Sequence, residues 1–177
     1  MQWFLNKKVE VINKQFKLQE QMGYSEETGT NRPTIVQVNL KQKTEDFINN
    51  HNISNWDSYW ENFKNNIAGT AFKQIYKSWS ENKLEEVRFL LSTRLYKSFE
   101  FWINMYKSND YKNKLENIEI NYLDLAKIDL DKFYDSITVR VYASCFDYIE
   151  NKNGALVSGS KNNLRWFSEY WTFIRKA

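Results

Sequence analysis

Residues 133–149 read FYDSITVRVYASCFDYI, a stretch that predicts one long β-strand. The residues at its odd positions are Ile137, Val139, Val141, Ala143 and Cys145. Those at its even positions are Thr138, Arg140, Tyr142, Ser144, Phe146 and Tyr148. Both sets contain β-branched or aromatic side chains, which is typical of a strand that is covered on both faces.

Two further stretches on either side of this one are also strand-like. Residues 116–125 (ENIEINYLDL) alternate with a period of two. Residues 164–175 (LRWFSEYWTFIR) place large apolar residues on both faces of a last long strand. Between the second and third stretches, residues 151–154 (NKNG) predict a tight turn. The C-terminal part of the chain therefore predicts an antiparallel sheet of long strands.

The apolar residues that precede these strands recur with a helical period. Residues 47–48 (FI) mark a short helix, and residues 54–57 have the spacing of a capping box. A long helix is predicted by the apolar stripe that runs from Phe63 to Trp79. Gly69 lies inside that helix and weakens the prediction that it is continuous.

Two more helices are predicted between the long helix and the first strand. Asn82 is expected to be an N-cap, because an acidic residue follows three positions later. The helix that it begins carries apolar residues between positions 84 and 91. Ser92 or Thr93 starts the next helix, which ends at residues 109–110.

This order of elements predicts an α+β fold, in which N-terminal helices pack on one face of a curved, mostly antiparallel sheet. Such a sheet wraps around its helices as a cone with a concave pocket. We assign residues 41–177 to this cone domain. Residues 1–40 form an N-terminal extension or hairpin, with a loop over 23–33 and a β-prone run over 34–38. This segment is too short to hold a core of its own.

Composition narrows the classes of function. The length of 177 residues suits one domain, and a net charge of +3 argues against a nucleic acid as partner. The single histidine, His51, is expected in a loop, and the single cysteine, Cys145, is expected to be buried and inert. A single cysteine cannot form an internal disulfide, and one histidine with one cysteine cannot supply a zinc site alone, so no metal or cofactor is predicted.

The sequence contains no apolar run near the ~20 residues of a membrane span. Its first residues, MQWFLNKKVEV, lack the apolar core of a signal peptide. The chain as given is therefore expected to be soluble, and its sequence alone indicates no compartment.

Two stretches, residues 71–99 and 147–176, carry a family resemblance. In the first, a helix ends in a tryptophan and is followed by a polar turn and a Leu-rich helix, at Trp79, Asn82, Arg88 and Leu91. In the second, an acidic turn leads through two glycines and an apolar pair to a strand ending in WTF, at Gly154, Leu156, Val157, Gly159 and 171–173. Over about residues 57–177, the chain resembles the C-terminal domain of the mitochondrial inner-membrane translocase subunit 44 and its bacterial relatives.

The resemblance implies a cone fold similar to nuclear transport factor 2, and it implies binding rather than catalysis. Members of the family act as membrane-peripheral scaffolds in mitochondria, and a mitoribosomal relative contacts the ribosome. In some bacterial relatives a zinc ribbon or a membrane segment precedes the domain, and this sequence shows neither. The resemblance implies the cytoplasmic domain of a membrane-associated bacterial protein.

A candidate pocket is suggested by charged residues inside the predicted strands. Its members are Asp124, Arg140 and Glu169, together with the ring of Trp171. As alternatives, the charged residues form a cross-strand pair or face solvent, and the ring belongs to the core. The sequence shows no Ser-His-Asp arrangement and no Gly-rich phosphate loop, so no catalytic residue is predicted.

A candidate partner surface is formed by basic residues of the helices, namely Lys73, Lys77, Arg94 and Lys97. These cations suit anionic lipid head groups, although acidic neighbours are also typical of a solvated face. The first hypothesis is a non-catalytic binding or scaffold module, peripheral to a membrane, whose partner is a protein or an anionic membrane surface. A small cone-fold enzyme of the dehydratase or isomerase type with a polar pocket is the alternative, and a nucleic-acid or ribosome contact is a third.

The pocket distinguishes the first two hypotheses. An open cavity that holds Asp124 or Glu169 within hydrogen-bond reach of a tyrosine favours the enzyme. A cavity filled by tryptophan and phenylalanine rings favours the binding module.

Overall fold

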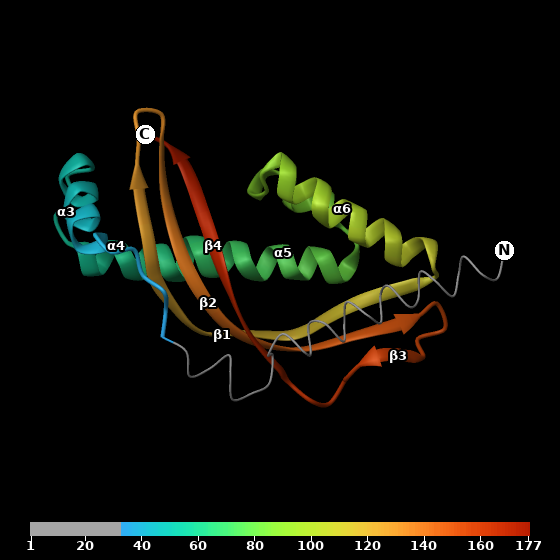
Figure 1. Ribbon diagram of the computed structural model, residues 1–177. Coiled ribbons are helices and arrows are strands. Elements are labelled where there is room, and N and C mark those ends of the chain that lie inside the picture. Colours follow the sequence, from blue (N-terminus) through green and yellow to red (C-terminus); the bar gives the residue numbers. More distant parts are fainter. Residues whose placement is uncertain (1–32) are drawn as a thin grey trace.

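The structure is a computed structural model that describes residues 33–177 (Figure 1). The helical elements are α3 (Leu40–Asn50), α4 (Trp56–Asn62), the π-helix η1 (Phe63–Ala68), α5 (Gly69–Glu81), the 3₁₀-helix η2 (Leu84–Leu90) and α6 (Thr93–Ser108). The strands are β1 (Tyr111–Leu130), β2 (Tyr134–Asn151), β3 (Leu156–Gly159) and β4 (Arg165–Lys176). Helices thus come first and strands afterwards, as the sequence predicts.

The predicted long helix is continuous from α4 through η1 to α5. Asn55 caps its start, because the Asn55 side chain accepts a hydrogen bond of 2.9 Å from the backbone N–H of Ser58. Gly69 keeps a right-handed helical backbone, with φ of −65°, so it does not interrupt the helix. The irregularity is instead the wider π turn of η1 immediately before it.

The prediction for Asn82 is wrong. Asn82 ends α5 rather than starting a helix, since its backbone is left-handed with φ of +58°. The N–H of the next residue, Lys83, bonds back to the carbonyl of Ser78 over 2.8 Å. The residues that follow form a 3₁₀-helix. The predicted restart at Ser92 is confirmed, because its hydroxyl accepts the N–H of Leu95 over 3.2 Å.

β2 is the central strand of the four-stranded sheet. It pairs with β1 along one edge and with β3 and β4 along the other, and all pairings are antiparallel. The ladder between β1 and β2 has three register shifts, which help a long hairpin to bend. Figure 1 shows the resulting strong curvature, with α5 crossing the sheet. The predicted fold class, helices on a curved antiparallel sheet, is confirmed.

Both faces of β2 are covered, as its sequence predicts. The odd-numbered Val139 and Val141 face the helices and pack with Phe47 and Phe72 in the main core cluster. On the opposite face, the ring of Tyr142 is 5 % exposed and lies near other rings of the sheet. A second cluster joins α5, η2 and α6, and its members are Ile75, Leu84, Val87, Leu91 and Ile103.

The described part of the N-terminal extension lies against β1. The backbone N–H of Gln37 donates to the carbonyl of Ala126 over 2.9 Å, and the Gln37 side chain accepts the N–H of Ile128 over 3.2 Å. The β-prone run 34–38 is not a strand of the sheet. The remainder of the predicted extension, including its loop, lies outside the described residues.

Candidate functional site

Glu169 and Trp171 lie on the helix-facing side of the sheet. The Glu169 carboxylate accepts two hydrogen bonds at Oε2, over 2.7 Å from the Tyr76 hydroxyl and over 2.9 Å from the Trp171 indole N–H. Burial, and then the charge of Glu169, raise the pKa of Tyr76 well above its usual value. The rings of Phe72 and Phe167 pack around this group, so aromatic side chains fill the concave face here.

Asp124 and Arg140 lie on the opposite face. They are cross-strand neighbours in the β1–β2 ladder. Thr34 donates its hydroxyl to Asp124 over 2.5 Å, and Arg140 Nε donates to the Ser168 hydroxyl over 3.2 Å. Arg140 is only 4 % exposed. The hydrogen bonds of these two residues thus connect β1, β2, β4 and the N-terminal segment on this face of the sheet.

The structure therefore brings the four candidate pocket residues together only in pairs. In the β2–β4 ladder Arg140 is opposite Tyr170, whereas Glu169 is opposite Val141. Adjacent residues of a strand point to opposite faces, so Arg140 and Glu169 cannot share a cavity. The alternation of side chains along the strands therefore places Asp124 and Arg140 on one face of the sheet, and Glu169 and Trp171 on the other.

A chain of buried polar contacts also joins α5 to the sheet, and no pattern in the sequence predicts it. Trp79 Nε1 donates to Asn113 over 2.8 Å, and Asn113 Nδ2 donates to Asp147 over 2.9 Å. Arg165 forms an ion pair with the same Asp147 carboxylate. Asn113 and Asp147 are both buried. Such fully bonded groups orient the strands and the helix relative to each other.

Cys145 lies beside this network and is fully buried. Burial first, and then the charge of Asp147, raise the pKa of its thiol to about 12, although the charge of Arg165 opposes the shift. The thiol is therefore protonated near neutral pH and is a poor nucleophile.

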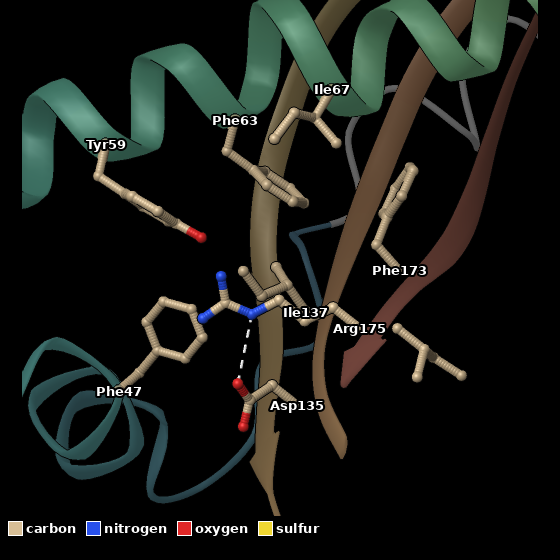
Figure 2. A pocket seen from close by; sticks show the side chains of 9 residues that line it. Phe47, Tyr59, Phe63, Ile67, Asp135, Ile137, Phe173 and Arg175 are labelled. Atoms are coloured by element: carbon tan, nitrogen blue, oxygen red, sulfur yellow. Dashed lines mark hydrogen bonds and ion pairs between the residues drawn. The ribbon is translucent and has the colours of Figure 1, made fainter. Parts of the chain in front are cut away.

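A half-open cavity of about 100 Å³ lies at the other end of the sheet, between the first helices and the ends of β2 and β4 (Figure 2). Its apolar lining consists of Phe47, Phe63, Ile67, Ile137, Phe173 and Ile174. Its polar lining consists of Tyr59, Asp135 and Arg175. The combination of an apolar wall with a few polar groups is typical of a small-molecule site.

Asp135 holds the polar side of this cavity together. Its carboxylate is within 2.7 Å of His51 Nε2 and within 3.3 Å of Arg175 Nε. The Arg175 guanidinium also lies over the ring of Phe47, 5.1 Å from its centroid. Figure 2 shows the Tyr59 hydroxyl pointing toward that guanidinium. Burial raises the pKa of Tyr59, and the charges of Arg175 and Asp135 lower and raise it respectively.

The sequence contained one signal for this cluster. Asp135 and Arg175 carry opposite charges near the ends of two predicted strands, and they are paired in the β2–β4 ladder. His51 is the C-cap of α3, as a loop position would suggest, but its partner Asp135 is far away in the sequence. Nothing local to residues 49–55 indicates that contact.

All four residues of the candidate partner surface are exposed. Lys73 and Lys77 are one turn apart on α5, and Arg94 and Lys97 lie in the first turns of α6. Lys97 forms an ion pair of 2.8 Å with Glu100. Within residues 33–177, no carboxylate lies within ion-pair distance of the other three. Two exposed rings lie near the α6 cations in the chain. Phe89 on η2 is 79 % exposed, and Phe101 on α6 is 61 % exposed.

Among residues 33–177, no group of three or more histidine, cysteine, aspartate or glutamate side chains is placed to hold a metal ion. None of the helices in the described part of the chain is long and apolar enough to cross a membrane.

Comparison with protein families gives a match to the Tim44-like domain over residues 60–177. Within residues 33–177, the matched region extends from the end of α4 through the four strands of the sheet. A comparison with curated proteins gives no match.

Proposed function

Because the chain belongs to the Tim44-like domain family, we propose that it is a non-catalytic binding module that attaches reversibly to an anionic membrane surface and serves there as a scaffold for a protein partner. The observation that carries this proposal is the segment η2–α6. It combines the exposed rings of Phe89 and Phe101 with the exposed cations Arg94 and Lys97.

Membrane attachment of this kind requires two signals. Cations near an anionic bilayer contribute about 1 kcal/mol each, and this attraction decays within a Debye length. Exposed apolar side chains add a contribution that salt does not screen. Phe89 and Phe101 are suited to the second role, and Lys73 and Lys77 on α5 add further positive charge. The expected attachment is weak and salt-sensitive.

The alternative of a cone-fold enzyme is not favoured. Glu169 and Tyr76 are within hydrogen-bond reach, but they bond to each other among packed rings rather than lining an open cavity. A carboxylate that is already held by two donors is a weak candidate for a general base.

Vesicle flotation tests the proposal directly. We expect recovery with vesicles that contain anionic lipid at low salt, less recovery at moderate salt, and little with neutral vesicles. The double variant Arg94→Gln/Lys97→Gln is expected to lose most of the recovery, and Phe101→Ser is expected to lose part of it. Lys152→Gln is the matched control, since Lys152 is an exposed cation that is paired with Asp110, beyond the C-terminal end of α6, whereas Arg94 and Lys97 lie in its first turns.

Two outcomes contradict the membrane part of the proposal. One is equal and negligible recovery with both kinds of vesicle, which leaves a protein as the sole partner. The other is a loss of recovery in Lys152→Gln as large as in the double variant, which indicates nonspecific attraction to net charge.

A further inference from the structure

We propose that the cavity beside Arg175 binds a small carboxylate with an apolar body, of roughly the size of benzoate. The cavity lies between α3, α4, η1 and the ends of β2 and β4 (Figure 2). The proposal is independent of membrane attachment, because none of the residues that it uses belongs to the basic surface of α5 and α6.

The apolar wall determines the body of the ligand. Phe63, Ile137 and Phe173 form part of this wall, and Ile67, which is 45 % exposed, lies at the cavity as well. An engineered apolar cavity of about 150 Å³ is known to admit benzene. A half-open cavity of about 100 Å³ therefore suits one ring or a short branched chain, with part of the ligand reaching solvent.

Arg175 determines the head group. Its Nε is used for Asp135, over 3.3 Å, and its guanidinium is stacked over Phe47. Among the described residues, no hydrogen-bond acceptor is bonded to its two terminal nitrogens. A guanidinium that is fixed in this way presents two parallel N–H donors, an arrangement that matches the two oxygens of a carboxylate.

Tyr59 supplies a further donor. Its hydroxyl points toward the guanidinium of Arg175 (Figure 2), and it has no hydrogen-bond partner among residues 33–177. Because burial raises its pKa, the phenol keeps its proton at neutral pH. It can therefore donate to a ligand oxygen.

The charge of Asp135 does not exclude an anion from this cavity. The Asp135 carboxylate lines the cavity, but its Oδ2 accepts a hydrogen bond from Arg175 Nε over 3.3 Å. Its negative charge is thus compensated on the side where the arginine lies. Among the described residues that line the cavity, the side-chain donors that remain available belong to Arg175 and Tyr59.

Methyl NMR of the full chain, labelled at the isoleucine δ1 carbons, provides the test. Ile67, Ile137 and Ile174 line the cavity, so their methyl signals report on it directly. We expect benzoate to shift these three signals saturably, with a dissociation constant on the order of 1 mM. Benzamide, which has the same shape without the charge, is expected to bind at least about tenfold more weakly. Inorganic phosphate, which has charge without an apolar body, is expected to leave the signals unchanged.

Three variants separate the head-group contacts from the cavity itself. Arg175→Met is expected to weaken benzoate binding at least about tenfold, and Tyr59→Phe about threefold, while Ile67→Trp is expected to block the cavity. Arg94→Met is the matched control, because it removes an exposed arginine of α6 and should leave binding unchanged. Thermal unfolding of each variant establishes that it is folded, and Tyr59→Phe and Ile67→Trp test the proposal even if Arg175→Met unfolds. Equal affinity for benzamide and benzoate, or unchanged binding in Tyr59→Phe and Ile67→Trp, overturns the proposal.

Discussion

The hydroxyl of Tyr76 on α5 donates a 2.7 Å hydrogen bond to Glu169 on β4. Tyr76 is partly buried among aromatic rings, so this bond connects the long helix to the sheet in mainly apolar surroundings. Such a bond is stronger than one at the surface, and its loss leaves a charged acceptor partly unsatisfied.

We therefore expect Tyr76→Phe to lower the free energy of unfolding by about 1–2 kcal/mol. Glu169 keeps only the indole N–H of Trp171 in that variant. Tyr134→Phe is the control, because Tyr134 is 51 % exposed, and its effect should remain within about 0.5 kcal/mol. Urea denaturation of the three proteins provides the measurement. Equal stability of the two variants would show that the Tyr76 bond contributes nothing.

Trp171 joins the two apolar clusters, since it packs against both of them. Its truncation to alanine opens a gap that neither cluster can close alone. We expect Trp171→Ala to cost about 3–5 kcal/mol and Trp171→Phe to cost much less. Chemical denaturation followed by circular dichroism measures both. An unchanged denaturation midpoint in Trp171→Ala would contradict this role in the core.

Two glycines with positive φ provide a matched pair. Gly154 (φ +77°) has no atom within 4 Å of the place where a Cβ would lie, whereas at Gly159 (φ +80°) a Cβ would be 2.7 Å from the Cα of Tyr148. Alanine at Gly154 should therefore cost about 1 kcal/mol, from backbone strain alone. Alanine at Gly159 adds a clash with the backbone and should cost about 3 kcal/mol or more. Similar losses at both positions would show that β2 moves aside at Gly159.

Alkaline pH should destabilise the fold from about pH 9 upward. The pKa of the Cys145 thiol is about 12 in the folded chain, against an ordinary value of 9.0. A raised pKa contributes stability that is complete below pH 9 and is lost as pH rises toward 12, because the unfolded thiol ionises first. Tyr106, with a pKa of about 12, adds to this loss above pH 10. Urea midpoints measured at about pH 8 and about pH 10 should fall less steeply in Cys145→Ala.

The domain boundary predicted near residue 40 remains a proposal. We expect a chain that begins at Asn39 to unfold cooperatively, at lower stability than the full chain, because it lacks the bonds of Thr34 to Asp124 and of Gln37 to Ala126 and Ile128. Calorimetry tests this expectation. Complete loss of a cooperative transition would place the N-terminal segment within the core domain.

The sequence predicted those features that depend on local periodicity. The alternation in residues 133–149 predicted a two-sided central strand, and Ser92 was correctly expected to begin a helix. Asn82 was predicted wrongly, because asparagine is favoured both at N-caps and in left-handed C-caps, and the surrounding residues suited either.

The candidate pocket was less predictable, because it depends on register between strands. Charges within a strand can be read from the sequence, but the face on which each lies relative to a partner strand cannot. Arg140 and Glu169 were thus grouped together although they lie on opposite faces. The contact of His51 with Asp135 depends on the docking of α3 against the start of β2, for which no local signal exists.

The position of β2 in the chain also has a consequence for biosynthesis. The helices α3 to α6 are all made before β2, and their buried residues, such as Phe47 and Phe72, pack against this strand. At a translation rate of roughly 5–20 residues per second, those helices leave the ribosome seconds before the strand that covers them. During that interval their apolar sides are open to solvent, where they are natural binding sites for chaperones. The yield of soluble chain should therefore depend on how quickly the last third of the message is translated.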